Sequence, residues 1–440
     1  MVAGWRARAV KAQAARSCVV VRDRFLESLR SGMEGLGQDG PASESISASV
    51  NRLTRKRFDP YSFLPSFHAA RTKYRRRETR KRAKSSYSNE GLDQPFTLSA
   101  SPAMAEYSRL SEPDPEFAPY VAQLTGTPQV YDVEERRNRF NSRFIETAKK
   151  CYAPGLPKET KYGVADHHVD VANGKILVKS LVPISEERLD ATYPLMVWMH
   201  GGGWATGNVD MDDYQLRAIC VELQISILNV EYRLVPEHPH PTSLNDCYTA
   251  LKWAASSPEL FSADLKKGFI VGGFSAGGHL ATVLAHRARD DPFFNDKPLT
   301  GQLLQVPALL HPNAIPEKYK LSLLSYEQNK QAPFLPQESI VWSYNQLGGI
   351  PTDPEVSPLL YPSHKGLVPA VIQVCGLDPL RDEDLLYDSL LKDAGVKTRT
   401  ATYSGVPHAF QYVFPTLKAA VKWAEDYRTG LRWLLDGAVA

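Results

Sequence analysis

Gly272-Gly273-Phe274-Ser275-Ala276-Gly277-Gly278-His279 is the stretch that decides how this 440-residue chain folds. The apolar run Phe269–Val271 precedes it and predicts a buried strand, and good helix formers follow from Leu280 to His286. Glycines on both sides of Ser275 allow a sharp strand-to-helix turn that presents a strained serine hydroxyl. The stretch therefore predicts a nucleophilic serine at the start of a helix.

Two more predicted strands end near residues with the chemistry that such a serine needs. Ala370–Val374 leads into Asp378, and Lys397–Tyr403 leads into His408. A serine hydroxyl is too weakly acidic to attack unaided, so it needs a histidine base that a carboxylate orients. Because the carboxyl ends of parallel strands lie at one edge of a sheet, we expect Ser275, Asp378 and His408 to meet.

A glycine-rich loop follows the first continuously apolar strand. The run Tyr193–Met199 ends at His200-Gly201-Gly202-Gly203-Trp204. Glycines at a strand end leave backbone N–H groups uncovered, so these groups can approach a substrate oxygen closely. A flexible loop is the alternative interpretation, but the position directly after a strand favours a role in binding an oxyanion.

Strands alternate with helices along most of the chain. His167–Val171 and Lys175–Pro183 flank Asn173-Gly174, which signals a hairpin. The later strands are continuously apolar, and this pattern predicts a mostly parallel sheet with helices on both faces. Helical periodicity in residues 113–155 and a proline-broken insertion at residues 311–349 predict a cap over the site.

Five motifs, taken in order, resemble the hormone-sensitive-lipase-like family of α/β-hydrolases. The resemblance runs from about Pro113 to Leu435 and implies an α/β-hydrolase fold with an eight-stranded sheet and a helical cap. The motifs are His200-Gly201-Gly202-Gly203-Trp204, Tyr232-Arg233-Leu234-Val235-Pro236-Glu237-His238-Pro239, Gly273-Phe274-Ser275-Ala276-Gly277-Gly278, Asp378-Pro379-Leu380-Arg381-Asp382-Glu383 and Pro407-His408-Ala409-Phe410.

The resemblance implies a role for each catalytic residue. Ser275 attacks a carbonyl carbon, His408 takes the serine proton and later delivers it to the leaving group, and Asp378 orients the imidazole. Asp382 is the rival acid. It lies at the start of a predicted helix, where a carboxylate commonly favours the helix dipole, so Asp378 is preferred.

The same resemblance implies the position of the oxyanion hole. Backbone N–H groups of Gly201, Gly202 and Ala276 are expected to hold the oxyanion, and Gly203 allows close approach. From their positions beside these motifs, three aromatic residues are expected to contact substrate, with core packing as the alternative role of each: Trp204, Phe274 and Phe410. Many members of the family have Asp at the position of Phe274 and Asn at that of His279, which changes the pocket floor. No metal or organic cofactor is implied.

Residues 1–103 differ from the rest in composition. They hold 20 Lys/Arg and 9 Asp/Glu, whereas residues 104–440 hold 32 basic and 40 acidic residues. Gly/Ser-rich tracts and the basic run at 73–84 predict a disordered leader, and the run itself is either a polyanion-binding or import patch or a solvated charge block. The acid-free first 22 residues are compatible with a mitochondrial presequence, and Met104 reads like a natural start.

Composition excludes several classes of protein. The acidic body, residues 104–440, argues against a nucleic-acid partner, and no apolar run approaches the ~18 residues of a membrane span. Five scattered cysteines argue against a disulfide framework and against zinc. We therefore expect a small-molecule partner and a cytoplasmic location, with a mitochondrial location and a homodimer left open.

These patterns predict a serine carboxylesterase that hydrolyses small, uncharged, short-acyl esters through an acyl-enzyme. Two alternatives share that chemistry: an acetyl esterase of a polyketide pathway and an arylacetamide-type amidase. A third alternative is a non-catalytic small-molecule receptor on the same fold, which the presence of every catalytic element disfavours.

Overall fold

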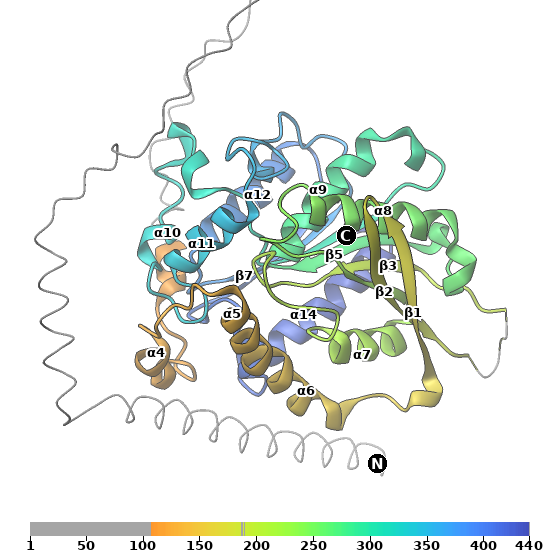
Figure 1. The fold of residues 1–440 in the computed structure, drawn as a ribbon, viewed down its shortest axis with the longest axis horizontal. Helices are drawn as coiled ribbons and strands as arrows, with labels where there is room; N and C mark the ends of the chain where they lie inside the picture. Colours follow the sequence, from red (N-terminus) through yellow and green to blue (C-terminus); the bar gives the residue numbers. More distant parts are fainter. Residues whose placement is uncertain (1–106, 186–187, 189, 440) are drawn as a thin grey trace, which may run out of the picture. The chain divides into compact units, whose positions relative to one another are not determined.

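A computed structural model describes residues 107–185, 188 and 190–439 (Figure 1). An eight-stranded sheet forms its centre, in the order β1-β2-β4-β3-β5-β6-β7-β8. The pairs β1/β2 and β2/β4 are antiparallel and all other neighbours are parallel, which confirms the predicted mostly parallel sheet. The strands are β1 (Tyr162–Val171), β2 (Gly174–Pro183), β3 (Leu195–Met199), β4 (Ser226–Glu231), β5 (Phe269–Phe274), β6 (Gly301–Gln305), β7 (Ala370–Cys375) and β8 (Thr398–Tyr403).

The sequence pattern of each strand matches its surroundings. β3, β5 and β7 are buried at every position, as expected for parallel strands that are covered on both faces. The β1–β2 hairpin turns at Asn173, whose φ of 61° is the left-handed conformation that an Asn-Gly turn uses. β1 begins at Tyr162, earlier than predicted, because its ladder with β2 continues through residues 163–166, which do not alternate between apolar and polar side chains.

Helices cover both faces of the sheet, as predicted. α7 (Asp213–Leu223) and α14 (Lys418–Leu435) pack on one face (Figure 1). The other face carries α8 (Thr242–Ser256), α9 (Ala276–Asp290) and α12 (Arg381–Asp393). α14 buries Trp423, Tyr427, Leu431 and Leu434, a helical spacing that places one apolar stripe against the strands.

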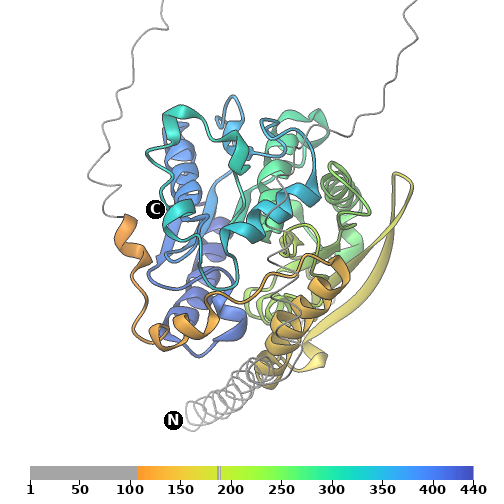
Figure 2. The same ribbon diagram turned by 60° about the vertical axis from the view of Figure 1, so that its left-hand side comes forward.

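Two segments distant in sequence lie beside each other outside the sheet (Figure 2). The first holds α4 (Ala118–Leu124), α5 (Val133–Phe140), the π-helical turn η2 (Asn141–Ile145) and α6 (Glu146–Tyr152). The second is the insertion with α10 (Ser325–Gln328) and α11 (Gln337–Leu347). Tyr131 donates a 3.1 Å hydrogen bond to Glu338, so the two segments are in direct contact.

Residues before α4 pack against the loops that follow β7 and β8. Gly405 N–H donates to the Leu110 carbonyl at 2.7 Å, and Asp114 N–H donates to the Gly405 carbonyl at 3.1 Å. A Cβ atom on Gly376 would lie 2.1 Å from the Leu110 oxygen, so this close approach requires glycine. The sequence pattern did not predict this contact.

The predicted leader, with its basic run, its possible presequence and the possible start at Met104, lies outside the described residues. Within the described part of the chain, no helix combines the length and apolar character needed to cross a bilayer.

Candidate active site

Ser275 lies in a strained turn between β5 and α9. Its φ of 56° and ψ of −115° are outside the conformations that L-residues favour. A Cβ atom on Gly273 would lie 2.3 Å from the Gly277 oxygen, and one on Gly277 would lie 2.0 Å from the Met199 oxygen. The turn therefore crosses the end of β3 at backbone distance, which only glycine allows.

Ser275, His408 and Asp378 form a continuous hydrogen-bonded chain. His408 Nε2 lies 2.9 Å from Ser275 Oγ, and His408 Nδ1 lies 2.6 Å from Asp378 Oδ2. Asp378 follows β7, His408 follows β8, and the carboxyl ends of the parallel strands bring both to Ser275. Asp378 is fully buried, and Ser275 is 8% exposed. This exposure leaves the hydroxyl as the end of the chain that a substrate can reach.

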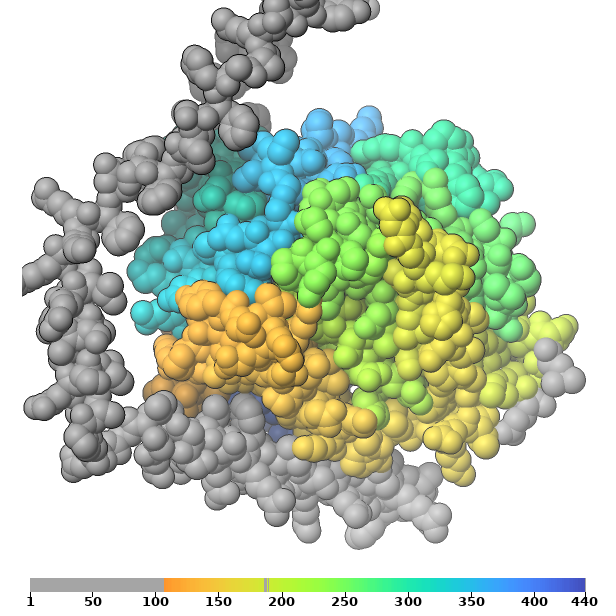
Figure 3. All heavy atoms as spheres, viewed as in Figure 1, coloured from red at the N-terminus to blue at the C-terminus, as the bar shows by residue number. Residues whose placement is uncertain are grey.

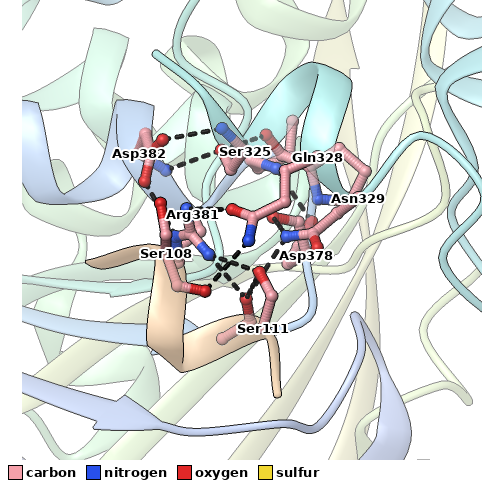
Figure 4. Close-up of polar contacts among 11 residues, drawn as sticks. Ser108, Ser111, Ser325, Gln328, Asn329, Asp378, Arg381 and Asp382 are labelled. Carbon is pink, nitrogen blue, oxygen red and sulfur yellow. Dashed lines mark hydrogen bonds and ion pairs between the residues drawn. The ribbon is translucent and has the colours of Figure 1, made fainter. Parts of the chain in front are cut away.

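Asp378 and its rival Asp382 have different partners (Figure 4). Asp378 points its second oxygen, Oδ1, at the N–H of Leu380, at 3.0 Å. Asp382 pairs with the buried Arg381 at 2.8 Å and accepts a 2.7 Å hydrogen bond from Ser325 N–H. Of the two carboxylates, Asp378 is therefore the one that contacts His408.

Arg381 is fully buried and joins three parts of the chain (Figure 4). It donates to Ser111 Oγ at 2.6 Å, to Gln328 Oε1 at 3.0 Å and to the carbonyl of Gly376 at 3.2 Å. Asn329 donates to the Asp378 carbonyl at 2.9 Å. The segment before α4 and the insertion thus hold the loop that carries Asp378, a network that the sequence pattern did not reveal.

The glycine-rich loop passes beside Ser275. Gly202, Gly203 and Ala276 line the cavity at the serine, whereas Gly201 is buried behind Phe274 and does not. Ala276 is the first residue of α9, so its N–H has no partner within the helix. Among the described residues, the N–H groups of Gly202 and Gly203 donate no hydrogen bond. The expectation for Gly201 is corrected accordingly, because Phe274 packs against Gly201 and the lining of the cavity includes only the two glycines that follow it.

Neighbouring side chains hold this loop in place. Thr206 donates through Oγ1 to the Gly202 carbonyl at 2.8 Å. His200 stacks on Tyr232 with ring centroids 4.3 Å apart, and Tyr232 Oη donates to the His200 carbonyl at 2.9 Å. Burial lowers the pKa of His200 to about 4, so its ring is neutral near pH 7. A loop fixed in this way keeps its free N–H groups oriented before a substrate arrives.

A cavity of about 90 Å³ surrounds the Ser275 hydroxyl. Its walls come from the body and from both segments outside the sheet, and most are apolar. The side chains that line it include Phe140, Phe144, Trp204, Met211, Phe274, Phe334, Leu335, Ile340, Tyr344 and Leu380. The residues from α5, η2 and α11 carried only a packing signal in the sequence, so that signal did not identify them as cavity walls.

Two of the three aromatic residues expected at the substrate line this cavity. Phe274 lies 5.2 Å from the His408 ring, and Trp204 donates to His279 Nδ1 at 3.2 Å. His279 then contacts the Glu355 carbonyl through Nε2 at 3.0 Å, which fixes the indole. Phe410, in contrast, is fully buried against Trp423. The left-handed Ala409, with φ of 62°, turns Phe410 into the core, which corrects the expectation from its position next to His408.

No three His, Cys, Asp or Glu side chains gather as a possible metal site in the part of the chain that the structure describes. The four cysteines in that part, Cys151, Cys220, Cys247 and Cys375, are all buried.

The parallel sheet, the serine turn and the Ser–His–Asp chain together define an α/β-hydrolase. The profile of the alpha/beta hydrolase fold family matches residues 196–412. An AB hydrolase superfamily protein of Schizosaccharomyces pombe is 40% identical over 333 residues, which cover 74% of this chain and 95% of that protein. The chain belongs to the hormone-sensitive-lipase-like family of α/β-hydrolases and is a carboxylic ester hydrolase.

Two further relatives indicate the range of the family. The versiconal hemiacetal acetate esterase of Dothistroma septosporum is 34% identical over 273 residues, covering 61% of this chain and 82% of that protein. The crystal structure of a vibralactone cyclase is 45% identical, with a TM-score of 0.71, and covers 74% of this chain and 96% of that one.

Proposed function

We propose that the protein is a serine carboxylesterase that works through an acyl-enzyme. The hydrogen-bonded chain from Ser275 through His408 to Asp378 is the observation that carries this proposal. His408 Nε2 accepts the serine proton as Oγ bonds to the ester carbonyl carbon, and the imidazolium then protonates the departing alcohol. Water, deprotonated by His408, releases the acid and restores Ser275. Asp378 holds Nδ1–H and stabilises the imidazolium.

The N–H groups of Gly202, Gly203 and Ala276 are the proposed donors to the oxyanion. They line the cavity beside Ser275, and the fixed loop requires little reorganisation when charge develops. Loss of one such donor typically raises the barrier by about 3 kcal/mol.

The inner cavity favours a short, uncharged acyl group. About 90 Å³ of mostly apolar space around Ser275 leaves little room for a long chain. The similarity to a versiconal hemiacetal acetate esterase supports an acetyl group in particular. An arylacetamide-type amidase and a non-catalytic receptor are the remaining alternatives. Turnover of a simple ester excludes the receptor, and the rate on an aryl acetamide compared with that on the matching ester distinguishes the amidase. The cytoplasmic location, the homodimer and the cap boundaries stay predictions.

Ring closure is a second candidate, supported by the 45% identity to a vibralactone cyclase. A lactone is a cyclic ester. If a hydroxyl of the bound acyl group attacks the acyl-enzyme in place of water, Ser275 is released and a lactone forms with the same residues. The ratio of lactone to free acid from a hydroxyacyl ester separates the two outcomes.

The primary test combines labelling with an acyl-length series. An organophosphonate should label Ser275, and Ser275→Ala and His408→Ala should each abolish hydrolysis of p-nitrophenyl acetate while circular dichroism stays that of the wild type. Among p-nitrophenyl esters from acetate to palmitate, the highest kcat/KM is expected at two to six carbons. Wild-type turnover by Ser275→Ala would refute the nucleophile, and a maximum at palmitate would refute the short-acyl pocket.

A further inference from the structure

A second, larger cavity adjoins the one at Ser275. Its volume is about 320 Å³, and four residues line both cavities: Arg136, Phe140, Phe144 and Phe334. It lies where the segment of α4 and α5 meets the insertion of α11; Figure 3 shows these segments, orange and cyan, in contact at the surface. The exposed residues Gly126 and Glu338 form part of its rim. The larger cavity is therefore a vestibule to the catalytic one.

The walls of the vestibule carry an excess of positive charge. They include Arg136, Arg139, Arg143 and Lys330 but one carboxylate, Glu338. Lys330 is paired with Glu327, and Glu338 accepts a hydrogen bond from Tyr131. Residues 104–440 contain more acidic than basic residues, so the positive charge of this cluster differs from the net charge of the chain around it.

Two arginines of the vestibule, Arg136 and Arg139, differ from Arg137, which lies between them in the sequence. Arg137 has a carboxylate partner, Glu237, at 2.7 Å. Arg136 instead donates to the Val130 carbonyl at 3.0 Å, and Arg139 donates to the Pro128 carbonyl at 2.7 Å. Within the described residues, neither Arg136 nor Arg139 forms an ion pair. Carbonyl groups orient these guanidinium groups but leave their charge uncompensated.

Packing further constrains these side chains. The guanidinium carbon of Arg136 lies 4.1 Å from the centre of the Trp342 ring, and that of Arg143 lies 5.9 Å from the Phe334 ring. Burial, and to a lesser extent the neighbouring charge of Arg139, lowers the pKa of Arg136 and of Arg143 to about 10 each. Burying like charges together is unfavourable in the empty protein, and such an arrangement is typical of sites that bind an opposite charge.

The local backbone is consistent with a binding role. Arg143 and Phe144 both lie in η2, the single π-helical turn between α5 and α6, and both line the vestibule. Single π-helical turns are rare and occur frequently at functional sites.

We propose that the arginine vestibule, defined by Arg136, Arg139 and Arg143, binds a carboxylate of the substrate. The planar, forked guanidinium group matches a carboxylate geometrically and keeps its charge at any physiological pH. The preferred substrates are then esters in which one part, the acyl group or the alcohol, is uncharged and occupies the catalytic cavity. The other part carries a carboxylate and extends into the vestibule. This inference rests on the proposed esterase function and narrows its substrate class.

Two matched pairs of esters test the proposal in both binding directions. Mono-p-nitrophenyl adipate is compared with p-nitrophenyl hexanoate, and 4-acetoxybenzoate with its methyl ester. The measured quantity is the ratio of kcat/KM for the acidic ester to that for its neutral partner, with the uncatalysed rate subtracted. We expect a ratio above one in at least one pair for the wild type. We expect that ratio to fall by about tenfold in Arg139→Gln and in Arg143→Gln, as for loss of a charged hydrogen bond.

Arg399→Gln is the matched control, because Arg399 is exposed at the beginning of β8, whereas the site lies at the carboxyl ends of the strands. It removes the same charge and should leave the ratio unchanged. Thermal melting of each variant identifies any that fails to fold. A wild-type ratio of one or less in both pairs overturns the vestibule proposal while leaving the esterase intact, as does an equal fall in the ratio of Arg399→Gln. Failure to hydrolyse any of the four esters overturns the esterase as well.

Discussion

Arg137 of α5 and Glu237 of the loop after β4 form a forked ion pair, with Nη1–Oε1 and Nη2–Oε2 distances of 2.8 and 2.7 Å. Arg137 also donates to the carbonyls of Ala205, at 2.9 Å, and Val235, at 3.1 Å. These contacts tie α5, which lines the catalytic cavity, to the residues that follow the glycine-rich loop. The same pairing with Arg137 lowers the pKa of Glu237 to about 2.

We expect Arg137→Lys to impair catalysis more than it impairs stability. A lysine ammonium cannot contact a carboxylate and two carbonyls in the geometry of a guanidinium fork, so α5 should lose its fixed position. A several-fold fall in kcat/KM for p-nitrophenyl acetate is expected with a change in Tm of no more than a few degrees, since half-exposed pairs contribute about 1 kcal/mol or less. Lys320→Met, which removes an exposed pair with Glu317, is the control. Equal kinetics in both variants would contradict the prediction.

We expect Asp378→Asn to impair catalysis and Asp382→Asn to impair stability. An amide at 378 no longer stabilises the imidazolium of His408, so kcat should fall by about 10³–10⁴ with little change in stability. An amide at 382 leaves the buried Arg381 without its counter-charge, which typically destabilises by about 3–5 kcal/mol. Urea denaturation and kcat, measured on both variants, show which carboxylate acts in catalysis and which stabilises the fold. A stable but inactive Asp382→Asn protein would reverse the two roles.

Asp212 should make stability fall as pH rises. It accepts hydrogen bonds from Trp198 Nε1 at 2.8 Å and Tyr412 Oη at 2.6 Å, and burial raises its pKa to about 6, although those bonds oppose the shift. A carboxyl group with a raised pKa in the folded state binds its proton more tightly there. Its stabilising contribution is therefore present at pH 4 and is lost as pH passes through 6.

The pH effect of Asp212 is measured against Asp212→Asn, which preserves the shape and has no proton to lose. Between pH 4.5 and 7.5 the wild type should lose about 2 kcal/mol of unfolding free energy relative to the variant. Subtracting the two proteins removes the contributions of all other carboxylates. A difference that stays constant with pH would show that Asp212 is ionised throughout.

Two truncations should have different effects on stability. Removal of residues 1–103 should leave the fold intact, whereas removal of the segment before α4 as well should destabilise it. The composition of residues 1–103 predicts that a chain starting at Met104 keeps its fold and activity. A chain starting at Glu116 loses Leu110 and Ser111, and with them contacts to Gly405 and Arg381. A buried donor left without its partner typically destabilises by about 1–3 kcal/mol, so the second chain should have a lower Tm. Unfolding of the Met104 chain would refute the first prediction, and equal Tm values would refute the second.

Local sequence patterns were sufficient to predict the fold and the residue types of the candidate catalytic site. Strand periodicity, the Asn173-Gly174 turn and the glycines around Ser275 each act within a few residues, so the printed chain contains their full cause. Strand ends in a parallel sheet share one edge, and this rule extended the local patterns to Asp378 and His408.

Contacts between distant segments, which only the tertiary structure shows, decided which residues line the cavities and which are buried in the core. Phe410 follows the catalytic histidine in sequence, yet one left-handed residue turns it into the core, and Gly201 packs against Phe274 instead of lining the cavity. Arg136, Arg139 and Arg143 lie in no motif of the sequence, and they line the vestibule together with residues of the α11 insertion. A side chain's environment is set by what packs against it, and for these three arginines the α11 insertion lies some 200 positions further along the chain.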